Sequence, residues 1–337
     1  MAKNLPKEDD PGTPPSMILS APDIVSLAIY FCALFGTIAN LVLIFAFVSN
    51  AFKNKVFQPL DKIIVNMAVV NLLLCCYKEI PGLLILFNAK VFGPTGCRFL
   101  LYFYHTLRLI SIWSVENLSF LHLIKIRRPG LSWSKFIHQH QAQYVNWSLA
   151  GCWAVSITFH MPYLLFPETL GYRNKSNIMM TSTNCLCPSQ SKLLKILTYT
   201  TVSVDFLLII LVVLLNWFTI DLICRHRHKV MDTMTARRGW NKHTAQATKI
   251  LLSLLLLYVI CWISSDIVWI AIVSGLIGND YESELLSALY GILSSIYYSV
   301  SSCIMVFGYR QVKDYLAEAG NCCRMGQTTV ENLEQQQ

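Results

Sequence analysis

Long apolar stretches recur along the chain, separated by shorter polar segments. Seven of them are predicted to be helices, over residues 24–48, 60–87, 97–126, 145–166, 193–224, 248–275 and 285–307. Each exceeds the roughly 20 residues that a helix needs to cross the hydrocarbon core of a membrane. Most are apolar on every face, and a backbone inside lipid must satisfy its own hydrogen bonds. The pattern therefore predicts an all-α membrane protein, a bundle of seven transmembrane helices.

The third stretch is the weakest of the seven by hydropathy. It contains His105, Arg108, Glu116 and His122, and ionisable side chains are expensive to place in lipid. Without it there would be six spans, and the charges of the connecting segments would fall out of phase. We therefore keep it as a span, and we expect its ionisable residues to face other helices.

Basic residues in the connecting segments predict the orientation. Lys and Arg gather after the first, third and fifth stretches, whereas the segment after the sixth carries Asp280, Glu282 and Glu284 and no basic residue. Short cytoplasmic loops are enriched in Lys and Arg, so the N-terminus is expected outside and the protein in the plasma membrane. The net charge of +8 then belongs to the cytoplasmic face and requires no nucleic acid partner.

Three regions follow from this pattern. Residues 1–22 are predicted to be a disordered outer tail, residues 23–308 the bundle, and residues 309–337 a cytoplasmic end. In the last region, residues 311–319 are expected to form a short helix along the membrane. The thiols that follow it are either a palmitoylation pair or two unmodified cysteines, at Cys322 and Cys323.

Composition excludes several classes of protein. Only 14% of the residues are charged, against about 25% in soluble domains. Twelve Cys are dispersed without metal-ligand spacing. The sequence contains no glycine-rich phosphate loop, zincin motif or intramembrane Ser–His pair, so we expect no enzyme, metal or cofactor. A transporter that uses intramembrane charges as a path remains the second hypothesis, although the two halves show no inverted repeat.

Outer cysteines predict a disulfide bond. Cys97 begins the third span, and Cys185 and Cys187 lie in the long outer segment after the fourth. Outside thiols meet an oxidising compartment, so a bridge from Cys97 to Cys185 or Cys187 is expected, and both partners stay open. The same segment carries an N-glycosylation acceptor at Asn174.

Arg108 is the strongest candidate for ligand contact. His105 lies three residues before it and therefore shares its helical face. At 1.5 Å per residue, Arg108 lies about 16 Å below Cys97, a depth suited to a pocket open to the outside. A permanently charged fork of donors suits a carboxylate, phenolate or sulfate. The residue thus predicts a small, anionic ligand.

Other ionisable residues lie in the outer halves of the spans, namely Lys78, Glu79, Asp205 and Asp266. Together they predict a polar cavity between helices. The alternative is that Arg108 is a structural partner of Glu79, Asp205 or Asp266, and both interpretations hold if a ligand competes for the guanidinium.

Polar residues deeper in the bundle suggest other roles. Asn40 and Asn71 are expected to hydrogen-bond between helices. Glu116, nearer the cytoplasmic side, favours a switch or packing role over ligand contact.

Several segments resemble the vomeronasal type 1 receptors and their fish relatives, the olfactory receptors related to class A. The matching segments are 59–61 (PLD), 71–74 (NLLL), 80–81 (IP), 96–99 (GCRF), 107–109 (LRL), 221–229, 244–248 (TAQAT) and 298–301 (YSVS). The sequence departs from rhodopsin-like receptors, because residues 122–126 read HLIKI where they have Asp-Arg-Tyr. Residues 300–307 also lack their Asn-Pro-x-x-Tyr.

The resemblance implies a chemosensory G-protein-coupled receptor for a small odorant or pheromone. It implies contact with a heterotrimeric G protein of the inhibitory type, and we expect the basic inner loops, above all residues 225–242, to make that contact. It also carries a ligand-site role to Arg108. Bitter taste receptors are the nearest rival family, and the expected Cys97 bridge argues against them.

Overall fold

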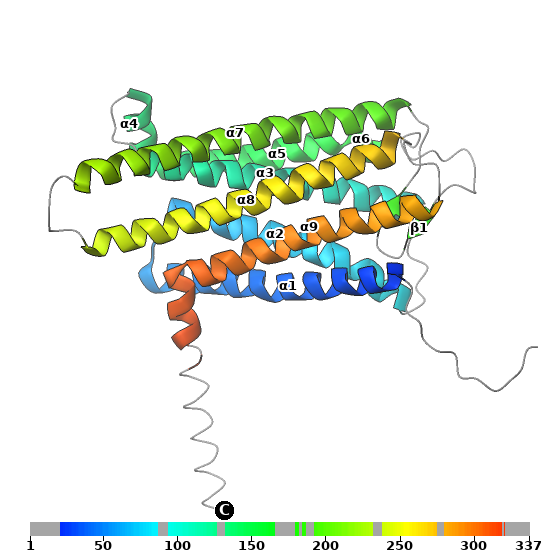
Figure 1. The fold of residues 1–337 in the computed structure, drawn as a ribbon, viewed down its shortest axis with the longest axis horizontal. Coiled ribbons are helices and arrows are strands. Elements are labelled where there is room, and N and C mark those ends of the chain that lie inside the picture. The colour runs from blue at the N-terminus through cyan, green and yellow to red at the C-terminus, as the bar shows by residue number, and fades with distance from the viewer. Residues whose placement is uncertain are drawn as a thin grey trace, which may run out of the picture.

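Long helices lie side by side along the longest axis of the molecule (Figure 1). The computed structural model describes residues 21–86, 94–126, 132–165, 179–181, 184–186, 192–231, 238–274, 280–318 and 320. The helices are α1 (Ala21–Asn54), α2 (Pro59–Leu86), α3 (Pro94–Ile126), α4 (Ser132–Gln139), α5 (Gln141–His160), α6 (Pro162–Leu165), α7 (Lys192–Met231), α8 (Arg238–Ser274) and α9 (Asp280–Gly308). Strands β1 (Met179–Thr181) and β2 (Asn184–Leu186) pair antiparallel.

The described residues of the predicted apolar stretches are helical, apart from Met161 in the fourth. In the described part of the chain, five segments are long and apolar enough to cross a membrane: Leu27–Asn54, Pro59–Tyr77, Lys195–Leu222, Leu252–Ala271 and Leu289–Gly308. Helices α3 and α5 are not among them. Helix α3 packs against α2, α5 and α7, and most of its polar side chains in the bundle are buried. Its low hydropathy therefore reflects polar contacts with neighbouring helices.

The fourth predicted helix, over residues 145–166, is wrong as a single element. Helix α5 ends at His160, and the short α6 starts at Pro162. A proline lacks the backbone N–H and its ring collides with the preceding turn, so the helix breaks there. Met161 closes α5 by donating its backbone N–H to the Thr158 carbonyl at 3.3 Å.

The C-terminal end of α7 and the N-terminal end of α8 extend beyond the predicted apolar stretches. Helix α7 continues to Met231 and α8 begins at Arg238, whereas the apolar stretches end at residue 224 and begin at residue 248. Hydropathy marks only the part of a helix that suits lipid. The helical hydrogen-bond ladder can continue through polar residues beyond that part, which hydropathy does not detect.

Small and polar residues join α1 to its neighbours. A Cβ on Gly36 would lie 2.7 Å from both Cys75 Sγ and Ser299 Oγ, so only glycine permits this approach. One turn further, Ser302 donates a hydrogen bond to Asn40 Oδ1 at 2.7 Å. Asn71 accepts a hydrogen bond from Ser111 at 3.1 Å, linking α2 to α3. The predicted interhelical roles of Asn40 and Asn71 are confirmed.

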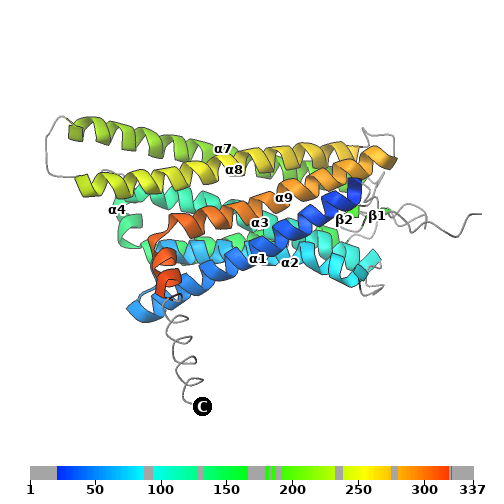
Figure 2. The same ribbon diagram turned by 60° about the horizontal axis from the view of Figure 1, so that its bottom comes forward.

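The two ends of the bundle differ. Strand β2 contacts α3 and α9 at one end, while α4 and a short helix over residues 310–318 lie at the other (Figures 1 and 2). In this short helix Val312 is fully buried and Tyr315 half-buried. Arg310 and Lys313 are exposed. A helix over residues 310–318 thus lies where residues 311–319 were expected to be helical, and its basic residues are exposed; its position along a membrane stays a prediction.

Candidate functional site

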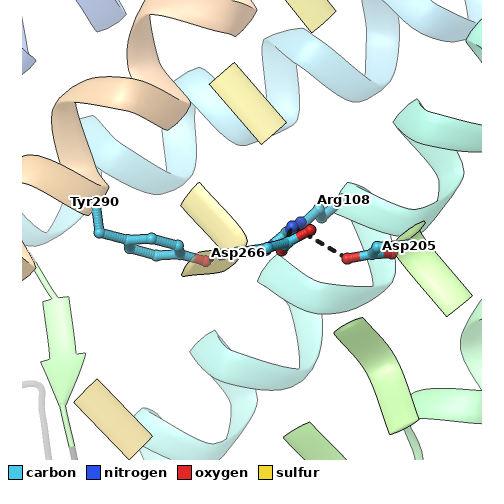
Figure 3. Close-up of polar contacts among 4 residues, drawn as sticks. All are labelled: Arg108, Asp205, Asp266 and Tyr290. Carbon is cyan, nitrogen blue, oxygen red and sulfur yellow. Dashed lines mark hydrogen bonds and ion pairs between the residues drawn. The ribbon is translucent and has the colours of Figure 1, made fainter. Parts of the chain in front are cut away.

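Four helices bring polar side chains together around Arg108 (Figure 3). Arg108 of α3 lies between Asp205 of α7 and Asp266 of α8. Its Nη2 atom is 3.1 Å from Asp205 Oδ2 and donates a hydrogen bond to Asp266 Oδ1. Its Nη1 atom donates to the Tyr290 hydroxyl of α9 at 3.4 Å. We call Arg108, Asp205, Asp266 and Tyr290 the ion cluster.

The ion cluster is closed off from solvent and lipid. Arg108 and Asp205 are each 1% exposed and Asp266 is 0% exposed. Removing charges from water is costly, and their mutual attraction offsets that cost only when the partners stay together. Because the four residues come from four different helices, these contacts tie α3, α7, α8 and α9 to one arrangement.

Charge within the ion cluster does not balance. Two carboxylates face one guanidinium, which leaves one formal negative charge when all three groups are ionised. Within the described part of the chain, neither Asp205 oxygen accepts a hydrogen bond, and Asp266 Oδ2 and Arg108 Nε are also without partners. Buried polar groups are normally paired. The ion cluster therefore has unused hydrogen-bond acceptors on Asp205 and Asp266 and one unused donor on Arg108.

Aromatic rings surround the ion cluster. The Arg108 guanidinium lies 4.6 Å from the ring centroid of Trp262, a cation–π contact. Beside Arg108 on α3, His105 stacks on Tyr163 with ring centroids 4.9 Å apart. Its ring is also 5.9 Å from His160 and 5.5 Å from Trp269. We call His105, His160, Tyr163 and Trp269 the aromatic cluster.

The predicted site residues separate into two groups. Arg108, Asp205 and Asp266 meet in the ion cluster, and His105 lies beside it. Glu79 instead accepts a hydrogen bond from Thr37 of α1 at 2.9 Å. Arg108 thus forms the structural pairing with two of the three acidic residues that the sequence offered as alternatives.

Some predicted features fall outside the described part of the molecule. Residues 1–20, Asn174, Cys187, Cys322 and Cys323 lie outside the described ranges, as do the side chains of Lys78, Cys97 and Cys185. The disulfide bond, the glycosylation and the palmitoylation therefore stay predictions. Strand β2, which contains Cys185, contacts α3, which contains Cys97.

Sequence reasoning missed four residues that border the site: Tyr163, Trp262, Trp269 and Tyr290. Each is an aromatic residue in an apolar stretch, where sequence alone indicates only core packing. His160 was also missed, although it is ionisable and falls within a predicted span. The rule that drew attention to His105 would have found it.

Within the described ranges, no three His, Cys, Asp or Glu side chains are grouped as metal ligands would be. The ion cluster holds charges in place between helices, so its contacts suit binding and conformational coupling.

Comparison with known proteins gives a consistent set of similarities. A family profile described as the vomeronasal organ pheromone receptor family matches residues 24–317. The chain is 21% identical to olfactory receptor class A-like protein 1 of Danio rerio, over 82% of this chain and 87% of the relative. It is 20% identical to vomeronasal type-1 receptor 96 of Rattus norvegicus, over 83% and 87%. It is 25% identical to taste receptor type 2 member 102 of Mus musculus, over 86% and 85%.

Proposed function

Because the chain belongs to the vomeronasal organ pheromone receptor family, we propose that the ion cluster is the ligand-operated switch of a seven-helix receptor. The chain is a multi-pass membrane receptor of a chemosensory, G-protein-coupled family, and not an enzyme. The observation that carries the proposal is the meeting of Arg108, Asp205, Asp266 and Tyr290 on four helices.

The switch works by redistributing these contacts. A ligand that pairs with one member of the ion cluster weakens that member's contact with Arg108, and it stabilises a different arrangement of α3, α7 and α8. A ligand shifts the population only by as much as it binds one arrangement better than the other. A site inside an interhelical ion cluster meets this requirement, because the ligand competes with the resting contact of the member that it binds.

The proposed orientation places the β-hairpin outside and α4 inside. Counted from the helix ends beside the hairpin, the four cluster residues are about 12 to 21 Å deep at 1.5 Å per residue. That depth suits a small molecule arriving from outside. At the opposite end, α4 and the inner ends of α7 and α8 carry the basic residues, which would face a heterotrimeric G protein.

Three further features belong to this proposal. Seven helices cross the membrane, α3 and α5 among them. Cys97 is bridged to Cys185 or Cys187, and Asn174 is glycosylated. An epitope tag at the N-terminus would test the orientation, since antibody should label it on intact cells.

The contacts of Arg108 weigh against the anionic ligand that the sequence predicted. An anionic ligand at Arg108 would have to compete with two carboxylates that already contact the same nitrogen. His105, Lys78 and Glu79 stay candidate ligand residues, although the described partner of Glu79 is Thr37.

Two rivals have specific support. The similarity to a taste receptor type 2 member favours a bitter-taste-type receptor with the same fold. The buried charges would also suit a transporter. The proposed function is tested by a calcium readout in cells that express the chain, screened with small amines, phenolic acids, steroids and bile-type acids.

A saturable response that requires a co-expressed G protein is expected. The contradicting result is flux of an active compound across receptor-containing liposomes, without any G protein dependence in cells. Surface labelling of the chain in the same cells shows whether the receptor reaches the plasma membrane, so that the absence of a calcium response is not mistaken for failed delivery.

A further inference from the structure

We propose that the ion cluster binds the ammonium group of a small aromatic amine, with Asp205 as its counter-ion. This inference rests on the proposed function, since it names the ligand class of the same site. Three independent observations carry it: the charge of the ion cluster, the incomplete pairing of Asp205, and the polar face of α7 that leads to it.

The first observation is the excess of negative charge. Among the described side chains, Asp205 and Asp266 form ion pairs with Arg108 alone. A buried carboxylate without a full counter-charge is unfavourable. One further cation completes the balance, whereas an anionic ligand would add a second uncompensated negative charge. The buried charges therefore select for a positive ligand.

The second observation identifies which carboxylate is available. Asp266 accepts a hydrogen bond from Arg108 Nη2. Asp205 forms an ion pair with the same nitrogen at 3.1 Å, but neither of its oxygens accepts a hydrogen bond from the described residues. An ammonium has three donors and no acceptor. It can therefore satisfy Asp205 while Asp266 keeps its contact with Arg108.

The third observation is a route for the amine. Thr198, Thr201 and Asp205 follow one another at spacings of three and four residues, so they share one face of α7. All three are buried, and the Tyr163 hydroxyl lies beside both threonine hydroxyls. Hydroxyls accept hydrogen bonds from an ammonium. They form a polar track from the outer end of α7 towards Asp205.

The aromatic cluster accounts for the rest of the ligand. Both ring nitrogens of His105 are buried and lack a hydrogen-bond partner within the described part of the chain. The ring stacks on Tyr163 and lies close to Trp269. An aromatic body inserted here would stack on these rings while its ammonium reached Asp205. Since the described side chains are packed around Asp205, binding requires α7 to move away from α3, which couples occupancy to the switch.

The experiment compares matched probes that differ only in charge. The first set is phenethylamine, phenylacetate and 2-phenylethanol, and the second is tryptamine, indole-3-acetate and tryptophol. Each compound is titrated against surface-verified cells, and separately against purified full-length receptor in a thermostability assay. Amines are expected to activate and to raise Tm, at concentrations at least tenfold below their alcohols, while the acids remain inactive.

Variants assign the contact. Asp205→Asn keeps the size of the side chain and removes its charge, and it should weaken amine potency by about 10- to 150-fold, the loss of one charged hydrogen bond. Ser203→Ala is the matched control, because Ser203 is exposed on the same helix and donates only to the Tyr199 carbonyl. The control should leave potency unchanged.

The outcomes separate this inference from the proposed function. Amines that stabilise the purified receptor through Asp205 but produce no G protein response would support the inference and contradict the receptor mechanism. A receptor that responds to the acids, or whose amine response survives in Asp205→Asn, overturns the amine assignment alone. The amine assignment is also overturned if neither assay detects any amine, although the receptor drives basal nucleotide exchange.

Discussion

Replacing Arg108 by methionine removes the positive charge that two buried carboxylates share. The side chain is 1% exposed, as is Asp205, and Asp266 is 0% exposed, so water cannot take over the contacts. Removal of one partner from a buried ion pair costs about 3–5 kcal/mol. At about 2 °C per kcal/mol, the lower end of the range for large domains, Tm should fall by about 6–10 °C.

A triple variant separates the charge from the packing. Arg108→Met combined with Asp205→Asn and Asp266→Asn leaves no uncompensated charge, because amides replace both carboxylates. Neutral replacement of a buried ion network is often close to neutral in stability. The triple variant should therefore regain most of the lost Tm, while its response to ligand stays absent.

The assay is thermal unfolding of purified receptor in one detergent, with Ser203→Ala as the control for substitution in a bundle helix. Surface delivery in cells should follow the same order, with the single variant lowest. A fall in Tm for Arg108→Met no larger than that of the control would refute the reasoning. So would a triple variant less stable than the single one, because the cost would then lie in packing.

Two further predictions test the packing and the outer loop. Gly36→Val should lower Tm by about 2–6 °C, because overpacking costs about 1–3 kcal/mol. Gly151→Ala is the control, since no neighbouring element lies within 4 Å of the added Cβ, and it should leave Tm unchanged or higher. Equal shifts in the two variants would count against the close helix contact at Gly36. Cys97→Ser should impair surface delivery, measured by flow cytometry. The same defect is expected in only one of the two partner variants, Cys185→Ser or Cys187→Ser. Normal delivery of Cys97→Ser would exclude an essential bridge.

The helices could be predicted from the sequence because lipid imposes a length and a composition on each span. The prediction failed where hydropathy carries no information. Pro162 divides the fourth span, and a proline inside an apolar stretch signals either a kink or a break. The polar turns that end α7 and begin α8 are also helical, and hydropathy does not register them.

The candidate site was predictable in its members but not in its pairing. Arg108, Asp205 and Asp266 stand out because each is an ionisable residue in a span. Their mutual contacts depend on the rotation of three helices, which one sequence does not specify. From the sequence, Glu79 was an equal candidate to pair with Arg108. The structure shows instead that it accepts a hydrogen bond from Thr37.

That pairing also reverses the inferred ligand charge. From the sequence, a lone Arg108 indicates an anionic ligand, because its acidic partners are unknown. Once Asp205 and Asp266 are counted beside it, the same site carries an excess of negative charge. The residue that suggested an acid is thus part of the site that we propose for an amine.

The most direct test of the central claim is nucleotide exchange on a purified heterotrimeric G protein by the receptor in lipid nanodiscs. Exchange is measured with and without a compound that is active in the cell screen, for the wild-type chain and for Asp205→Asn. A saturable, compound-dependent rise in the wild-type chain, lost or weakened at least tenfold in Asp205→Asn, is the predicted result. The contradicting result is that the receptor does not change the rate of nucleotide exchange, with or without the compound, while receptor-containing liposomes take up the same compound. That result would favour transport.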